Sequence, residues 1–189
     1  MNSVTNEIKV WDPLVRIFHW SLVTAFTIAY ASEDDYMLVH SYAGYTIIGL
    51  LLIRLIWGFI GTTHARFSGF IRPPREALSY LKDSATFKAK HYLGHNPAGG
   101  LMIIALLVSL LLTTLTGMSA YGIEGGGPLA SALSGVGGFG KEAFEEMHEF
   151  LANFTLFLVV AHVAGVILSS ISHGENLIRA MFTGTKQAG

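Results

Sequence analysis

Long apolar stretches alternate with shorter polar segments along the chain. Four of them, at about 14–31, 40–60, 98–121 and 150–170, have the length that a helix needs to cross a bilayer, about 17 to 25 residues. The chain shows no repeat with a period of about 20 to 50 residues, which excludes a solenoid. The pattern predicts a single domain over residues 1–189, an all-α membrane protein folded as a four-transmembrane-helix up-down bundle.

The composition supports this class of protein and excludes several others. Of the 189 residues, 51% are hydrophobic and 13% are charged, which is about half the charge of an ordinary soluble domain. The sequence contains no cysteine, so iron–sulfur clusters, thiolate zinc sites and covalently attached c-type haem are excluded. A net charge of −1 gives no electrostatic support for nucleic-acid binding.

The first apolar stretch is expected to remain in the protein as a membrane helix. It is followed directly by Ser32, Glu33, Asp34 and Asp35, which do not form the small-residue cleavage site of a signal peptide. We therefore interpret this stretch as a retained helix rather than a cleaved leader.

Charged residues separate into two groups that indicate the orientation of the chain. Basic residues precede the first stretch, fill the connection between the second and third, and follow the fourth; they are Lys9, Arg16, Arg66, Arg72, Arg75, Lys82, Lys88, Lys90, Arg179 and Lys186. By the positive-inside rule, both termini and that connection are expected to be cytoplasmic. The two outer loops contain one basic residue, Lys141, and several acidic ones, so the outer face is expected to be acidic. The acidic residues are Glu33, Asp34, Asp35, Glu124, Glu142, Glu145 and Glu146.

Four of the eight histidines form two pairs at matching depths. His19 and His162 lie in the inner half of the membrane, whereas His40 and His148 lie at the outer boundary. The 14 residues from His148 to His162 span about 21 Å, close to four turns, so both lie on nearly one helix face. Ionisable residues inside membrane helices usually mark function, and neutral imidazole is a common axial ligand of haem iron.

These positions predict two noncovalently held, bis-histidine b-type haems, one in each half of the membrane. Cofactor sites in helix bundles are built from side chains on facing helices, as such pairs would be. The alternative is that each histidine only forms a hydrogen bond to a neighbouring helix.

Several motifs resemble bacterial cytochrome b561 and the b-type cytochrome subunits of nickel–iron hydrogenases. The resemblance lies in VWDPLVRIFHW at 10–20, RLIWGFIG at 54–61 with ARF at 65–67, GHNP at 94–97, HEFLAN at 148–153, AHVAG at 161–165, and ENLIRAM at 175–181 with Gly184. It implies a di-haem electron carrier of the bacterial inner membrane. It also implies that the metal ligands pair as His19 with His162 and His40 with His148.

Two arginines are candidates for binding haem propionates. Arg54 follows His40 by 14 residues, which places it on nearly the same face at the depth of the inner haem. A buried arginine needs an anion, although an arginine at the membrane boundary can instead extend to lipid phosphate. The same two interpretations apply to Arg16, one turn before His19.

His95 and Asn96 are candidates for binding a quinone near the inner haem. They lie where the cytoplasmic connection meets the third apolar stretch. Helix capping by Asn96 before Pro97 is a simpler and sufficient explanation for the asparagine. The remaining histidines fall in polar cytoplasmic sequence and are expected to be interfacial or solvated; they are His64, His91 and His173.

The pattern predicts transmembrane electron transfer between a membrane quinone and a periplasmic redox partner, as part of a respiratory chain. The expected partner is a basic c-type cytochrome or another redox subunit, attracted to the acidic outer face. The glycine-rich segment 122–140 is expected to be a loop that covers the outer haem edge or orders against this partner. No side-chain nucleophile or general base is required, and a homodimer is left open.

Two other classes of function remain as alternatives. The first is an oxidoreductase that passes electrons between superoxide or another small molecule and quinone. The second is a haem-free transporter that uses the same histidines, or a passive membrane anchor subunit. No aspartate or glutamate lies inside the four predicted spans, which argues against cation transport.

Overall fold

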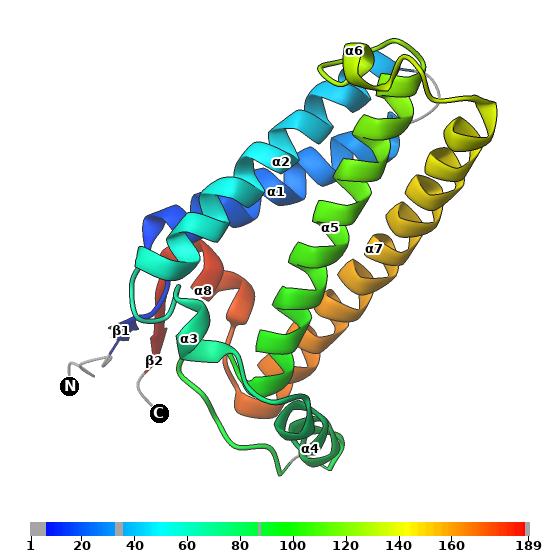
Figure 1. The fold of residues 1–189 in the computed structure, drawn as a ribbon. Coiled ribbons are helices and arrows are strands. Elements are labelled where there is room, and N and C mark those ends of the chain that lie inside the picture. Colours follow the sequence, from blue (N-terminus) through cyan, green and yellow to red (C-terminus); the bar gives the residue numbers. More distant parts are fainter. Residues whose placement is uncertain (1–6, 33–35, 87, 188–189) are drawn as a thin grey trace, which may run out of the picture. The chain divides into compact units, whose positions relative to one another are not determined.

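The computed structural model describes residues 7–32, 36–86 and 88–187 and is almost entirely helical there (Figure 1). Along the chain these residues form β1 (Glu7–Lys9), α1 (Pro13–Ala31), α2 (Met37–Ile60), α3 (Phe67–Phe70), α4 (Pro74–Ala85), α5 (Pro97–Ile123), α6 (Ala130–Leu133), α7 (Gly138–His173), α8 (Leu177–Thr183) and β2 (Thr185–Gln187). Within the described ranges, four helices, α1, α2, α5 and α7, are long and apolar enough to cross a membrane. The predicted all-α class is confirmed, and so is the expectation of four helices of membrane-spanning length and apolarity.

The fourth helix is longer than predicted. It begins at Gly138 rather than near residue 150, so His148 lies within the helix and not before it. The segment 122–140, expected to be a loop, contains α6 and the first residues of α7. The apolar pattern did not predict the early turns of α7, because these turns are charged. Lys141 and Glu145, which lie one turn apart there, form an ion pair at 3.5 Å.

The polar connection between α2 and α5 also contains helices. Pro74 occupies the first turn of α4, where its missing N–H removes no helical hydrogen bond. Ala77 and Tyr80 are buried, whereas most of the other described residues of this helix are exposed. The connection is therefore an ordered element rather than a plain linker.

The described chain divides into two compact units. Unit 1 comprises the described parts of 1–19, 54–104 and 160–189, and unit 2 comprises those of 20–53 and 105–159. Each of the four long helices contributes residues to both units. His19 and His162 consequently belong to unit 1, and His40 and His148 belong to unit 2.

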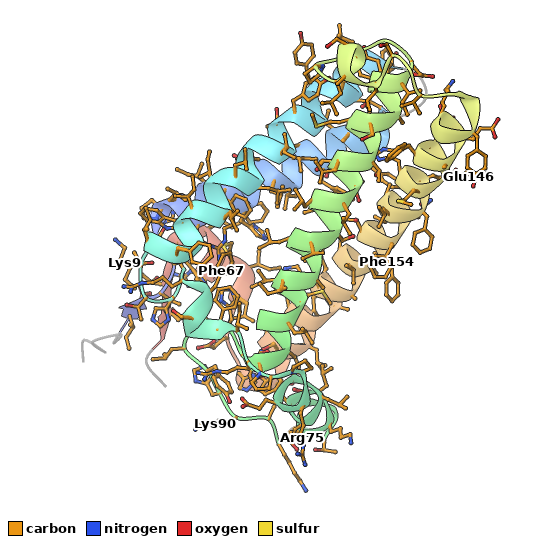
Figure 2. All side chains as sticks on the ribbon, viewed as in Figure 1. Lys9, Phe67, Arg75, Lys90, Glu146 and Phe154 are labelled. Atoms are coloured by element: carbon orange, nitrogen blue, oxygen red, sulfur yellow. The ribbon has the colours of Figure 1, made fainter. Side chains whose placement is uncertain are left out.

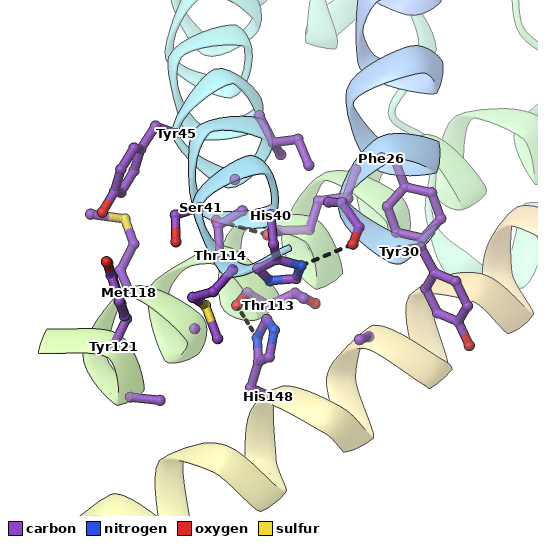
Figure 3. A pocket seen from close by; sticks show the side chains of 18 of the residues that line it. Phe26, Tyr30, His40, Ser41, Tyr45, Thr113, Thr114, Met118, Tyr121 and His148 are labelled. Carbon is purple, nitrogen blue, oxygen red and sulfur yellow. Dashed lines mark hydrogen bonds between the residues drawn. The ribbon is translucent and has the colours of Figure 1, made fainter. Parts of the chain in front are cut away.

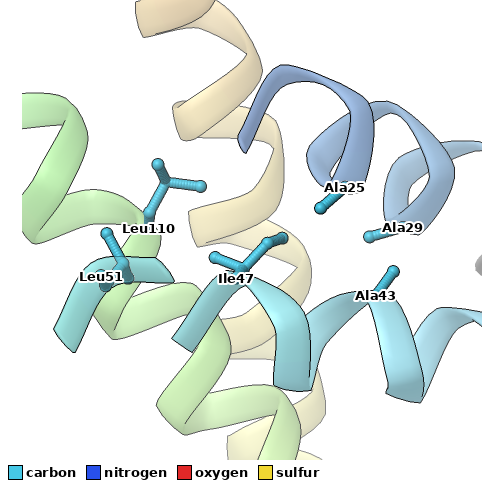
Figure 4. Close-up of a cluster of buried hydrophobic side chains, with 6 residues drawn as sticks. All are labelled: Ala25, Ala29, Ala43, Ile47, Leu51 and Leu110. Atoms are coloured by element: carbon cyan, nitrogen blue, oxygen red, sulfur yellow. The ribbon is translucent and has the colours of Figure 1, made fainter. Parts of the chain in front are cut away.

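Unit 2 is held together by a cluster of small and aliphatic side chains. The cluster consists of Ala25 and Ala29 from α1, Ala43, Ile47 and Leu51 from α2, and Leu110 from α5 (Figure 4). Alanines at a helix contact allow the two backbones to approach closely, which is how membrane helices commonly associate.

The outer surface of α7 in unit 2 is strongly apolar. Phe150, Phe154 and Phe157 are exposed and stack in a row, with ring centroids 6.3 Å and 6.4 Å apart. Figure 2 shows Phe154 projecting from the side of this helix. Such a row would be costly in water, and it is suited to contact with lipid.

Unit 1 joins the two ends of the described chain. β1 pairs antiparallel with β2, and the backbone N–H groups of Val10 and Trp11 donate to the carbonyl oxygen of Gly184 at 2.9 Å and 3.0 Å. Val10 and Trp11 are buried against Ala180 of α8. This pairing was not predicted, because strands of three residues carry almost no periodic signal.

Asp12 links the beginning of α1 to the end of α2. Its carboxylate accepts hydrogen bonds from the N–H of Val15 at 2.9 Å, Trp57 Nε1 at 3.1 Å and Thr62 Oγ1 at 2.6 Å. Burial by itself would raise the pKa of Asp12, but the hydrogen bonds from Thr62, Val15 and Trp57 outweigh it and lower the pKa below its usual value. A buried carboxylate thereby caps one helix and anchors another.

Candidate functional site: two histidine pairs

In unit 2, His40 of α2 and His148 of α7 face one another (Figure 3). Their ring centroids are 5.9 Å apart and the ring planes are nearly perpendicular, at 87°. Both side chains are partly buried. The sequence placed these two histidines at the same depth, and the structure brings them together.

Backbone carbonyls orient both rings of this pair. His40 Nδ1 lies 2.9 Å from the carbonyl oxygen of Ala29, and His148 Nδ1 lies 2.8 Å from that of Thr113. A carbonyl oxygen can only accept a hydrogen bond, so each Nδ1 carries the proton and Nε2 keeps its lone pair. This tautomer, held by a carbonyl on the other nitrogen, is the usual state of a histidine that binds a metal.

The two rings line a cavity of about 200 Å³ within unit 2. Its other lining residues include the aromatic rings of Tyr45 and Tyr121 and the carboxylates Glu124 and Glu145. The cavity wall requires a glycine at 117, because a Cβ there would lie 2.7 Å from Cε1 of His148. A side chain at position 117 would therefore displace the imidazole of His148.

The donor set in this cavity fits a haem better than a bare metal ion. Across the described residues, no group of three or more histidine, cysteine, aspartate or glutamate side chains is arranged to hold a metal. A closed protein site for zinc needs four ligands, whereas haem supplies four nitrogens itself and takes axial ligands from the protein. Two oriented imidazoles on facing helices therefore match what a haem requires.

In unit 1, His19 of α1 and His162 of α7 are within electrostatic reach of each other. Both imidazoles are partly buried, and His95 interacts electrostatically with His162 as well. The structure thus places the second predicted pair in the same unit and within electrostatic range, with His95 also within electrostatic range of His162.

Arg54 is buried in unit 1, with an exposed fraction of 4%. Its Nη2 donates to the carbonyl oxygen of Ala65 at 3.0 Å, and its guanidinium carbon lies 5.0 Å from the centroid of the Phe67 ring. Nη1 is buried and has no hydrogen-bond partner among the described residues. This burial disagrees with an arginine that extends to lipid phosphate, and the free N–H group is suited to an anion.

Arg16 also has a buried donor atom. Its Nε is buried and, in the part of the chain that the structure describes, has no hydrogen-bond partner. The guanidinium packs against Gly184, which has a φ of 86° and caps the end of α8. A Cβ at Gly184 would lie 2.7 Å from the carbonyl oxygen of Trp11 and 3.0 Å from Arg16 Nη1, so a glycine is needed for both conformation and space.

His95 packs between two aromatic rings just before α5. Its ring centroid lies 4.5 Å from that of Trp11 and 4.8 Å from that of Phe70. Burial, reinforced by the positive charges of Arg54 and Lys186, lowers the pKa of His95 to about 3. The imidazole is therefore neutral at physiological pH, and its Nδ1 is buried with no hydrogen-bond partner within the described ranges.

Asn96 caps α5. Its Oδ1 accepts a hydrogen bond from the N–H of Gly99 at 2.7 Å, and Pro97 follows as the first helical residue. The simpler of the two interpretations of Asn96 thus accounts for its side-chain oxygen, while its amide NH₂ group is not used by the cap.

Two of the remaining histidines join a polar network in unit 1. His91 Nε2 lies 3.0 Å from Glu175 Oε1, and Lys186 Nζ lies 3.1 Å from Glu175 Oε2. His173 contacts the carbonyl oxygens of Ser169 and Ala89 through its two ring nitrogens, at 3.1 Å and 3.3 Å. The third, His64, is partly buried, and its Nδ1 would lie 2.9 Å from a Cβ added at Gly94. None of these histidines is freely solvated.

Sequence reasoning missed Asp12 and Thr155. Asp12 could have been found, because an aspartate directly before a proline is a typical helix start. Thr155 is fully buried, with an exposed fraction of 0%, although a threonine in an apolar stretch attracts no attention. Its position midway between His148 and His162 in the sequence was the available signal.

These features define a membrane protein with paired, oriented histidines, the class to which b-type cytochromes belong. Residues 10–184 match the family described as prokaryotic cytochrome b561, and the chain belongs to this family. The resemblance inferred from the motifs is confirmed. Family membership implies haem b and electron transfer in the membrane, and it agrees with a multi-pass membrane protein.

Three curated relatives share low but extensive similarity with the chain, and each is named a probable Ni/Fe-hydrogenase B-type cytochrome subunit. The protein from Rhizobium leguminosarum bv. viciae is 22% identical, over 95% of this chain and 89% of its own length. That from Bradyrhizobium diazoefficiens is 24% identical (95% and 86%), and that from Azotobacter vinelandii is 27% identical (94% and 87%). No solved structure matches the chain.

Proposed function

We propose that residues 1–189 form a single di-haem domain that transfers electrons across the bacterial inner membrane between a quinone and a periplasmic redox partner. One haem b would be held by His40 and His148 and the other by His19 and His162. The proposal depends chiefly on the unit 2 pair, where two facing imidazoles have Nε2 left as the nitrogen able to bind iron. Haem iron supplies the one-electron chemistry that these side chains lack.

The arginines of unit 1 are the proposed partners of haem propionates. Arg54 Nη1 and Arg16 Nε are buried N–H groups without partners in the described residues, and each is a strong donor to a carboxylate. A buried charge is tolerated only when an anion or a hydrogen-bonding network compensates it, and Asp12 compensates Arg54 only through electrostatics. A second anion at this position would complete the compensation.

A quinone is proposed to bind beside His95 and Asn96, on the cytoplasmic side. His95 is neutral and packs against the aromatic rings of Trp11 and Phe70, side chains of the kind that line sites for aromatic small molecules. The amide NH₂ group of Asn96 can donate to a quinone carbonyl while its oxygen continues to cap α5. The positive-inside pattern supports cytoplasmic termini on the same side.

The redox partner is proposed to dock at the acidic end of unit 2. Glu142 and Glu146 are exposed on the first turns of α7, and Glu124 and Glu145 lie at the cavity that holds His40 and His148. Such a surface favours a cationic c-type cytochrome. The names of the three relatives make a hydrogenase the second candidate partner. Whether the domain also forms a homodimer affects neither histidine pair as proposed.

The proposal is tested by measuring haem in the purified protein. Protein from haem-sufficient cells should contain two haem b per chain and show low-spin, dithionite-reducible spectra without covalently attached haem. Quinol should reduce it in the membrane. A colourless protein, or one haem per chain, would contradict the di-haem assignment.

A further inference from the structure

Three hydroxyl side chains are buried together between α5 and α7 in unit 2. Ser109 and Thr113 of α5 have exposed fractions of 3% and 8%, and Thr155 of α7 is not exposed at all. Hydroxyl groups inside an apolar helix contact are expensive unless they are hydrogen-bonded, so their arrangement is informative.

The hydroxyl groups form a connected set. Thr155 Oγ1 lies 2.6 Å from Ser109 Oγ and 3.2 Å from Thr113 Oγ1. Thr155 donates to the carbonyl oxygen of Leu151 at 2.7 Å, and Thr113 donates to that of Ser109 at 2.8 Å. With these two protons committed, the Ser109 hydroxyl donates to Thr155 Oγ1, which makes a direct bond between the two helices.

The same stretch of α5 also orients one of the predicted haem ligands, His148 of α7. The carbonyl oxygen that accepts from His148 Nδ1 belongs to Thr113, whose side chain is part of the hydroxyl set. Thr155 follows His148 by seven residues, about two turns, so both lie on one face of α7. The helix α7 is therefore attached to α5 at two levels, through His148 and through Thr155.

We propose that Thr155 is a positioning residue for His148. By bonding to Ser109, it holds α7 in register with α5 so that the His148 N–H group remains on the Thr113 carbonyl. That hydrogen bond makes the imidazole a stronger electron donor through Nε2, which favours the oxidised iron and lowers the midpoint potential at this pair. The inference rests on the proposed function, because it assumes that His148 binds haem iron.

The test compares Thr155→Val with the control Thr46→Val. Valine keeps the shape of threonine but removes the hydroxyl. Thr46 of α2 belongs to the same unit, is not among the residues that line the cavity of His40 and His148, and donates its hydroxyl to the carbonyl oxygen of Tyr42 in its own helix at 2.9 Å. Loss of a hydroxyl group that joins no second helix should therefore leave the potential unchanged.

The readouts are the midpoint potential and the low-spin electron paramagnetic resonance signal of the haem that disappears in a His148→Ala variant. In Thr155→Val, that potential should rise by an amount equivalent to about a threefold to tenfold change in the ferric–ferrous equilibrium, the scale of one interhelical hydrogen bond. The other haem should be unchanged, Thr155→Ser should restore the potential, and Thr46→Val should leave it unaltered.

Several outcomes would overturn the inference. They are an unchanged potential in Thr155→Val, an equal shift of both haems, and an equal shift in Thr46→Val. If Thr155→Val does not accumulate, Ser109→Ala removes the same bond from the other helix and should raise the same potential. A protein that binds no haem, or a His148→Ala variant that loses none, would instead overturn the proposed function.

Discussion

The two histidine pairs belong to the same class of site but lie in opposite electrostatic surroundings. Unit 1, which contains His19 and His162, buries Arg54 and holds Arg16 partly buried, each with one buried N–H group that has no partner in the described residues. Around His40 and His148, unit 2 provides backbone carbonyls, hydroxyl groups and a carboxylate-lined opening. Positive charge stabilises the reduced, less positive form of a redox centre, and carbonyl-bonded imidazoles stabilise the oxidised form. We therefore expect the haem of unit 1 to have the higher potential.

The largest expected effect comes from removing one ligand of each pair in turn. His162→Ala should eliminate the haem of unit 1 and leave that of unit 2, while His148→Ala should do the reverse. Each purified variant should contain about half of the wild-type haem, with one of the two potentials missing from a redox titration. Equal loss of both haems in each folded variant would show that the pairs are not independent sites.

Arg54→Met should weaken the electrostatic contrast between the pairs. Two unit charges about 8 Å apart in a medium with an effective dielectric constant of about 20 interact by about 2 kcal/mol, so loss of a buried cation at such a range would lower the potential of the unit 1 haem by an amount on this scale. Arg54→Lys should retain most of the effect, although it loses the planar donor to Ala65.

Arg179→Met removes an exposed cation from the same unit and serves as the control. Redox titration of all three variants measures the shift. A fall of the same size in the unit 2 haem, or in the control, would exclude a local effect of Arg54.

His95 should make the stability of unit 1 dependent on pH. Its pKa of about 3 in the folded protein lies below the ordinary value of 6.5, so the unfolded chain binds more protons between these values. Stability should thus increase with pH from about 3 to 6.5, by up to about 1.4 kcal/mol per pH unit, and level off above that range. His95→Gln should remove this slope in detergent denaturation curves measured at pH 5 and pH 7. An unchanged slope would show that His95 is not held neutral by the fold.

The smallest effect is expected at the acidic surface of unit 2. Glu142→Gln with Glu146→Gln removes two exposed charges and should slow the second-order reaction with a cationic c-type cytochrome by a few-fold at low salt. The difference should vanish at about 0.5 M salt, where exposed charges are screened. Stopped-flow rates across ionic strength measure it, and rates that are independent of salt would rule out electrostatic docking at this surface.

The four long apolar helices and the facing of His40 and His148 could be predicted from the sequence, because both depend on one-dimensional properties, apolar length and helical rise. The start of α7 at Gly138 could not be predicted from the sequence, because its first turns are charged. They are stabilised by tertiary contacts such as the ion pair between Lys141 and Glu124, at 2.8 Å. The hydrogen-bond partners of Nδ1 in His40 and His148 could not be predicted from the sequence either. Every residue has a carbonyl, and only the packing of the helices selects those of Ala29 and Thr113.

The pairing of Glu7–Lys9 with Thr185–Gln187 lay beyond sequence reasoning for a different reason. It brings together segments from opposite parts of the chain, and the strands are too short to show alternation. The buried network of Glu175 and Lys186 is similar, because a lysine near the end of a polar segment looks solvated until its carboxylate partner is located.

The open N–H groups of Arg16 and Arg54 have a consequence for how the protein is made. A buried donor that remains unsatisfied costs about 1–3 kcal/mol, and more when it is charged, which is a large share of the stability of a small fold. If haem propionates bind these arginines as proposed, a newly inserted chain without haem starts at a deficit and would be a better target for membrane proteases. The supply of cofactor in the cell would then set the abundance of the protein as well as its activity.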